Sequence, residues 1–186
     1  MPQEVLRTIG HSTLSIELFL QALRDNGCQV VVDVRRYPGS RRYPQFDQER
    51  LFASLAGAGI RGIWCEGLGG RRKALAESVN TAWRNQGFRG YADYMQTAEF
   101  QTEIAWLIQQ MARNPVAIMC AEALPWRCHR SLIADAVLAH GLVVEDIFVS
   151  PQGSSSRRPH VLTNFARVEG DRVWYPAESE ASLFPA

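Results

Sequence analysis

Short apolar runs alternate with amphipathic segments along most of this chain, and this alternation limits the possible folds more than any other feature. Strand-like runs are predicted at 5–10, 29–34, 60–65, 116–119 and 142–149. Segments with apolar residues at helical spacing are predicted at 15–25, 48–56, 97–112 and after residue 130. Near-continuous apolar strands separated by helices are typical of a covered parallel sheet. We therefore expect an α/β three-layer sandwich with a mainly parallel, roughly five-stranded sheet flanked by helices.

The domain organisation follows from the length and from changes in composition. A chain of 186 residues is long enough for one domain with a substantial core. We expect an α/β domain over 1–149, with an aperiodic insertion near 71–96 that holds a short helix. The insertion also contains GFRGYADYM (87–95), whose mixed aromatic and charged residues are typical of a loop over a pocket or of packing against the sheet edge. The segment 150–186 is expected to begin as a flexible polar connection and to continue as a C-terminal β-hairpin that packs on the same domain.

Composition excludes several classes of protein. No apolar run approaches the roughly 20 residues of a membrane span, and no secretory signal is visible at the amino terminus. Four cysteines without a small secreted-domain pattern favour reduced thiols in the cytoplasm. A formal net charge of +1 predicts no general affinity for nucleic acid or membranes. No cofactor and no oligomeric state can be assigned from the sequence.

Polar and reactive residues follow the predicted strands. They are His11 and Ser12, Asp33 and Arg35, Glu66 and Arg71, and Cys120 and Glu122. Because the carboxyl ends of parallel strands meet at one edge of a sheet, ligands bind there in α/β proteins. We therefore expect these loops to converge on one site. Asp33, inside an apolar run, is expected to form an ion pair with a neighbouring arginine.

The segment 116–137 carries the densest set of reactive side chains. It is predicted as a buried strand, a polar turn and a helix, and the turn contains two thiols, an imidazole and several guanidinium groups. Free amides at a helix start attract anions and lower thiol pKa values. Cys120 is therefore a candidate nucleophile, although the pattern favours a buried, inert cysteine somewhat more. The candidate catalytic residues are Cys120, Glu122, His11, Cys128 and His129.

A second set of residues is assigned to substrate binding. Arginine suits bidentate binding of phosphate or carboxylate, and glycines allow backbone amides to approach a ligand. The candidates are Ser12, Arg35, Arg41, Gly69, Gly70, Arg71, Trp126, Arg127 and Arg130. No metal is assigned to this candidate site. A zinc or iron site using Cys120, Cys128 and His129 is a weaker alternative, because adjacent Cys128 and His129 are expected to point to different sides of a helix start.

With these residues in view, the chain resembles the bacterial and archaeal family known as domain of unknown function 488. The matching stretches are TIGHS (8–12), VVDVRRYPGSRR (31–42), LGGRR (68–72), GFRGYADYM (87–95) and MCAEALPWRCHRSLIAD (119–135). Together they cover most of the chain up to about residue 148. The resemblance supports the map of the site, but the family name states no reaction.

The order strand, cysteine, loop, arginine, helix is also similar to that of rhodaneses and cysteine phosphatases, whose loop amides and arginine hold an oxyanion. Two departures stand out. Six residues separate Cys120 from Arg127 where those enzymes have five, and the loop contains Glu122 and Pro125. A carboxylate in the loop would oppose a bound anion.

The leading functional hypothesis is an enzyme that binds an anionic, phosphate-bearing substrate, possibly a nucleotide or nucleic acid, at the strand ends. In this hypothesis the arginines hold the anion, and Cys120, Glu122 or His11 carries nucleophilic attack or proton transfer. Two alternatives come from other classes. One is a non-catalytic nucleic-acid-binding module, and the other is a thiol- or metal-dependent sensor.

Overall fold

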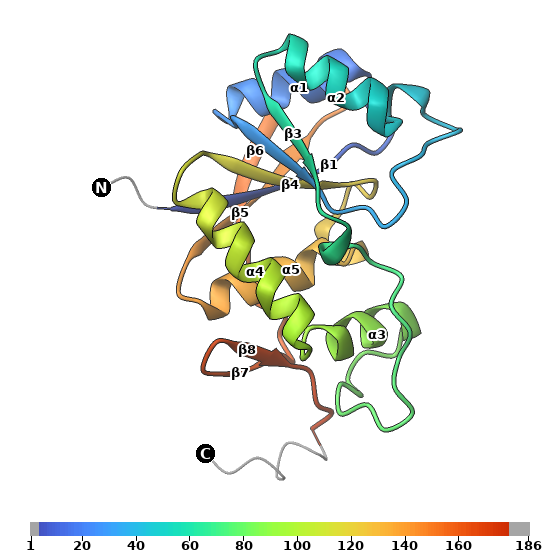
Figure 1. Cartoon of the computed structure of the whole chain (residues 1–186), viewed down its shortest axis with the longest axis vertical. Coiled ribbons are helices and arrows are strands. Elements are labelled where there is room, and N and C mark those ends of the chain that lie inside the picture. Colours follow the sequence, from blue (N-terminus) through green and yellow to red (C-terminus); the bar gives the residue numbers. More distant parts are fainter. Residues whose placement is uncertain (1–3, 179–186) are drawn as a thin grey trace.

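Six strands form one sheet in the order β3-β2-β4-β1-β5-β6 in the computed structural model, which describes residues 4–178 (Figure 1). The strands are β1 (Val5–Gly10), β2 (Val30–Asp33), β3 (Arg61–Trp64), β4 (Val116–Cys120), β5 (Val143–Val149) and β6 (Ser155–Pro159). The first five are parallel, and β6 runs antiparallel to β5. The predicted α/β class with a mainly parallel sheet is confirmed.

Helices cover both faces of the sheet and complete three layers (Figure 1). They are α1 (Ile16–Asp25), α2 (Gln48–Gly57), α3 (Gln86–Tyr94), α4 (Ala98–Met111) and α5 (Arg130–Ala139). The hydroxyls of Ser15 and Thr97 accept backbone N–H groups at the starts of α1 and α4, each over 3.2 Å. Such caps satisfy amides that have no partner within the helix. Asp47 directly precedes α2, but its side chain makes no capping hydrogen bond.

Alternating residues of the buried strands divide the core into two clusters. Val31, Ala117 and Met119 pack with α1 and α2 on one face. Val32 and Ile118 pack with α3, α4 and α5 on the other. Because the strand residues in the middle of the sheet meet a helix layer on either face, these strands are largely apolar, and most polar side chains lie at the strand ends, where the loops begin.

Two segments differ from the sequence-based expectation. Residues 155–159, assigned to a polar connection, form the edge strand β6, whose exposed serine and arginine side chains lack the apolar alternation that would have identified it. The segment GFRGYADYM, interpreted as a loop over a pocket, is helix α3, and Asn85 caps its start. Gly90 lies in this helix where the backbone of Arg72 approaches too closely for a Cβ atom.

The predicted C-terminal hairpin is present as β7 (Arg167–Glu169) and β8 (Arg172–Trp174). Val173 is buried against the sheet-covering helices, whereas Val168 in the other strand of the hairpin is 44% exposed. Residues 179–186 of the predicted C-terminal segment lie outside the described residues. Within 4–178, no helix combines the length and apolar character needed to cross a membrane.

The neighbouring strands β1 and β4 send their helices to opposite faces of the sheet. After β1 the chain enters α1 on one face, and after β4 it enters α5 on the other. The register pairs Gly10 with Cys120, so the two loops begin side by side. In open α/β sheets a crevice forms at such a divergence.

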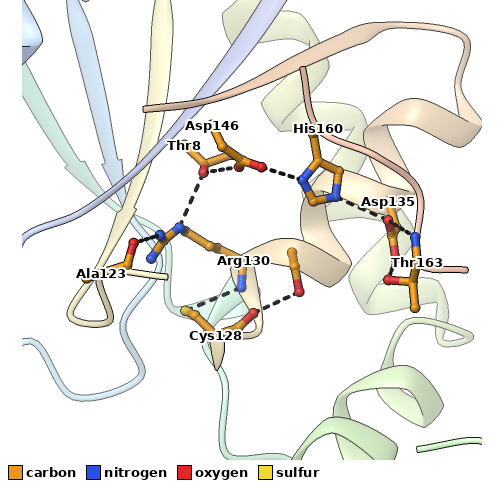
Figure 2. A network of polar contacts seen from close by, with 9 residues as sticks. Thr8, Ala123, Cys128, Arg130, Asp135, Asp146, His160 and Thr163 are labelled. Atoms are coloured by element: carbon orange, nitrogen blue, oxygen red, sulfur yellow. Dashed lines mark hydrogen bonds and ion pairs between the residues drawn. The ribbon is translucent and has the colours of Figure 1, made fainter. Parts of the chain in front are cut away.

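A buried polar network joins the central strands to the C-terminal segment (Figure 2). His160 lies between two carboxylates, with Nδ1 2.8 Å from Asp146 and Nε2 3.2 Å from Asp135. The hydroxyls of Thr8 and Tyr175 donate to Asp146 and Asp135 over 2.6 and 2.8 Å. Burial lowers the pKa of His160, but the hydrogen bonds and charges of the two aspartates outweigh it and raise this pKa to about 9.

This network predicts a stability difference that depends on pH. The folded pKa of His160 lies above its unfolded value of about 6.5, so the charged imidazole stabilises the fold fully below pH 6.5 and loses this effect as pH rises to about 9. The His160→Gln variant should therefore be less stable than the parent by on the order of 2–3 kcal/mol at pH 6, and the difference should shrink toward pH 9.5.

The measurement is urea unfolding of both proteins at several pH values. Taking the difference between parent and variant cancels other groups that titrate in the same range, including Cys120. A stability difference that stays constant from pH 6 to 9.5 would contradict a charged His160.

Candidate functional site

The loops after β2, β3 and β4 and the start of α5 enclose a pocket of about 230 Å³. The short 3-10 helices η2 (Glu66–Leu68) and η3 (Pro125–Arg127) shape two of these loops, and η1 (Pro44–Phe46) lies in the loop after β2. The pocket is lined by Arg35, Arg36, Tyr37, Gly70, Arg71, Cys120, Ala121, Glu122, Cys128 and His129. Both thiols of the β4–α5 segment therefore face the same small space.

Arg130 lies fully buried beneath this pocket. Its Nη1 donates to Cys120 Sγ over 2.8 Å and also to the backbone carbonyl of Glu122, and Nη2 donates to the carbonyl of Ala123 over 2.9 Å. Its Nε reaches the hydroxyl of Thr8 at 3.3 Å (Figure 2). Among these direct partners, the Cys120 thiol is the only group that can carry a negative charge.

The pKa values of the two pocket cysteines are shifted in opposite directions. Burial alone would raise the pKa of Cys120, but a hydrogen bond from Cys128 and the Arg130 guanidinium outweigh it and lower this pKa to about 7. The pKa of Cys128 is raised well above its ordinary value by burial, by the hydrogen bond to Cys120 and by the charge of that thiolate. Near neutral pH the pair therefore holds one thiolate and one thiol, with the negative charge on Cys120.

His129 contacts the second thiol. Its Nδ1 lies 3.6 Å from Cys128 Sγ, and its Nε2 lies 2.8 Å from the carbonyl oxygen of Val34. A carbonyl can only accept, so Nε2 carries the proton. Burial lowers the pKa of His129 to about 4, which leaves a neutral ring whose bare Nδ1 faces Cys128.

The expectation that Cys128 and His129 point to different sides is therefore wrong. The reason is local backbone geometry. Cys128 is still extended, with φ −133° and ψ 144°, and α5 begins only at Arg130. The angular spacing of side chains around a helix therefore does not apply to this pair.

Guanidinium groups at the pocket differ in how fully they are already paired. Arg35 forms the expected ion pair with Asp33, with contacts of 2.6–3.1 Å. Arg36 lies 3.4 Å from Glu66, and both side chains are partly exposed. Arg71 is exposed and lies 5.4 Å over the Tyr37 ring. Because its guanidinium forms no ion pair with any carboxylate of residues 4–178, Arg71 is the pocket arginine best placed to bind an incoming anion.

Close backbone approaches hold the loops in place. A Cβ atom at Gly10 would overlap the Glu122 carbonyl and come within 2.9 Å of Arg130 Nη1, so only glycine fits there. Backbone strain occurs at Ser12 and Arg71, whose φ values of 46° and 58° lie in the left-handed region that favours glycine. Such conformations cost roughly 1–3 kcal/mol for non-glycine residues and concentrate at functional sites.

Several predicted site residues lie outside the pocket lining. His11 is buried and stacks on Phe46 with ring centroids 4.1 Å apart, and its Nδ1 lies 2.9 Å from the Ser12 carbonyl. Burial lowers the pKa of His11 to about 4. The other predicted residues outside the lining are Ser12 and Trp126, which line separate pockets, the exposed Arg41 and Arg127, and the buried Gly69 and Arg130.

Sequence reasoning missed part of the pocket and all of the network behind it. Arg36, Tyr37 and Ala121 line the pocket but were not among the candidates. The Asp135–His160–Asp146 arrangement was also missed, although Asp135 among the apolar residues of α5 and Asp146 within an apolar strand were visible signals. A carboxylate on a buried face requires a partner. Within residues 4–178, no three His, Cys, Asp or Glu side chains are grouped so that they could hold a metal ion.

The comparisons with known proteins give one match. A family model described as a domain of unknown function, DUF488, matches residues 15–137, about two thirds of the chain. The matched region contains β2 to β4, the pocket and most of α5. No curated protein and no solved structure matches the chain significantly.

The geometry predicts that Arg130 controls the ionisation of Cys120. In Arg130→Lys the ammonium cannot reproduce the guanidinium contacts, and the pKa of Cys120 should rise by about 1–2 units from about 7. The measurement is the pH titration of thiolate absorbance in protein carrying Cys28→Ser and Cys65→Ser, with circular dichroism to check folding.

Arg127→Lys is the matched control, because Arg127 lies in the same segment but is exposed. It should leave the titration unchanged, and Cys120→Ser should remove it. A Cys120 pKa that is the same in Arg130→Lys as in the parent would contradict the role assigned to Arg130.

Proposed function

Because the chain belongs to the DUF488 family, whose description assigns no activity, we propose a function from its own site: an enzyme in which the Cys120 thiolate attacks a small anionic substrate. The observation that carries this proposal is the 2.8 Å contact between the buried Arg130 guanidinium and Cys120 Sγ. A structural cysteine needs no such partner. Nucleophilic thiols, in contrast, are activated by an adjacent cation that lowers their pKa.

The other cysteines support this distinction. Cys28 and Cys65 are also buried, but burial raises the pKa of Cys28 to about 11. Burial and the hydrogen bond to Glu103 raise the pKa of Cys65 to about 12. At neutral pH these thiols stay protonated and weakly nucleophilic. Cys120 alone among the four combines a lowered pKa with a place in the arginine-lined pocket.

Anion binding is assigned to the arginines around the thiolate. Arg71 would contact the substrate directly, and Arg35 and Arg36 would add positive charge from their ion pairs at the pocket wall. A volume of about 230 Å³ holds one small anionic group, since sites for larger ligands run from roughly 300 to 1,000 Å³. A nucleotide would thus enter by one phosphate rather than as a whole.

Glu122 is proposed to move a proton at the pocket entrance. Its carbonyl is held by Arg130, while its exposed side chain lines the pocket. A carboxyl group there can give a proton to a leaving group or take one from an attacking water. The four free thiols suit a reducing compartment, and we therefore place the reaction in the cytoplasm.

Occupation of the pocket by an anion should protect Cys120. Inorganic phosphate should slow alkylation of Cys120 by iodoacetamide, because the anion would sit against Arg71 and block the thiolate. In Arg71→Gln the phosphate concentration that gives half protection should rise roughly tenfold. The readout is site-resolved mass spectrometry of the Cys120 peptide over time.

Arg41→Gln is the control, because Arg41 is an exposed arginine outside the pocket lining. It should leave protection unchanged. Slow alkylation of Cys120 at neutral pH would contradict the proposal that Cys120 is a nucleophilic thiolate. Equal loss of protection in the Arg41 and Arg71 variants would contradict the assignment of anion binding to Arg71.

A further inference from the structure

We infer that Cys120 and Cys128 are the attacking and resolving thiols of a dithiol site that reduces a small anionic disulfide. This inference rests on the proposed function for the Cys120 nucleophile and adds the class of substrate. Its starting point is the second thiol, which attack by Cys120 on a phosphate or carbonyl centre would not need. Both cysteines line the same pocket, and both sulfur atoms accept hydrogen bonds from Arg130.

Arg130 donates a hydrogen bond to each of the two sulfur atoms. Its Nη1 contacts Cys120 Sγ at 2.8 Å, and its backbone N–H points to Cys128 Sγ at 3.5 Å. The strand end and the helix start thus bring thiols eight positions apart in sequence to one residue. A shared pocket and a shared neighbour place the two thiols on the same side of the site, as an internal disulfide between them requires.

The proton of Cys128 has two acceptors. One is the Cys120 thiolate, and the other is the bare Nδ1 of His129, 3.6 Å from Cys128 Sγ. The hydrogen bond from Nε2 to the Val34 carbonyl fixes the tautomer that leaves Nδ1 bare. Once Cys120 is bonded to a substrate sulfur it no longer accepts the proton, and His129 becomes the remaining base for Cys128.

The reaction balances in two exchanges. The Cys120 thiolate attacks one sulfur of a substrate R–S–S–R, which forms Cys120–S–S–R and releases RS⁻. Cys128 then attacks Cys120 Sγ while its proton shifts toward His129 Nδ1 in the same step. This forms the Cys120–Cys128 disulfide and releases a second RS⁻, which takes the proton from His129 and leaves as RSH. The substrate disulfide gains two electrons, and the protein dithiol loses them.

The charge of the pocket selects the substrate. Arg71 and Arg36 at the entrance favour a disulfide whose R groups carry carboxylates or similar anions. A cationic disulfide of the same length should react more slowly. An external dithiol returns the protein to its reduced form, and dithiothreitol can supply this step in a turnover experiment.

The test compares three disulfides of similar size and different charge: those of mercaptoacetate, mercaptoethanol and cysteamine. In the parent, the mercaptoacetate disulfide should react fastest and yield peptides joined through Cys120 and Cys128. In Cys128→Ser, the reaction should stop at a stable mercaptoacetate adduct on Cys120. Cys120→Ser should form no adduct on Cys128.

His129→Gln tests the base. The glutamine amide can keep the donor to the Val34 carbonyl but offers no acceptor at the position of Nδ1. The first exchange should keep its rate, which also shows that the site is folded. Release of the second mercaptoacetate should slow by at least about tenfold.

The outcomes separate the two proposals. If Cys120 in Cys128→Ser is alkylated rapidly and protected by phosphate but forms no mixed disulfide, the dithiol inference is overturned and the proposed enzyme stands. An adduct that persists on Cys120 of the parent, with no link to Cys128, also overturns it. If Cys120 is alkylated slowly at neutral pH, both proposals fail.

Discussion

A single buried guanidinium organises the candidate site. Arg130 begins α5 and reaches the end of β4, the loop beyond it and the hydroxyl of Thr8 on β1. An unpaired charge in the interior would be costly, and these contacts satisfy it while they bring two strands, a loop and a helix together. The position of Cys120, the shape of the pocket and the ionisation of the thiol all depend on this one side chain.

Burial limits how far the Cys120 pKa falls, because it opposes the hydrogen bond from Cys128 and the Arg130 guanidinium, and the pKa reaches about 7. Arg130 and the protonated His160 are matched by the carboxylates of Asp135 and Asp146. The Cys120 thiolate is stabilised by the charge of Arg130 and by hydrogen bonds, which together outweigh the cost of its burial. The balance suits a nucleophile near neutral pH, since a thiol of much lower pKa would attack more weakly.

The fold could be predicted where one physical rule dominates. Apolar strands and capped helices gave β1, α1 and α4 almost to the residue, and the carboxyl-end rule brought Cys120, Glu122 and Arg71 into one pocket. Prediction failed where tertiary contacts decide. β6 consists of exposed polar residues that form a strand because β5 offers an open edge.

The roles of individual site residues were harder to predict from the sequence. His11 directly follows strand β1 and His129 follows the polar turn after β4, yet one stacks on Phe46 and the other contacts Cys128. Arg127 and Arg130 are three residues apart, but the first is exposed and the second is fully buried. Residue type and spacing place such side chains in a loop, and only packing decides which way each one turns.

The Arg130 guanidinium binds the β4–α5 loop by hydrogen bonds to the main-chain carbonyls at positions 122 and 123, not through the side chains at these positions. The carbonyl groups are present whatever amino acids occupy these positions. Evolution can therefore exchange the exposed side chains of this loop, and with them the molecules it accepts, while the sulfur atom and its cation keep their geometry. A scaffold of this kind can diversify its chemistry by altering the rim and leaving the centre alone.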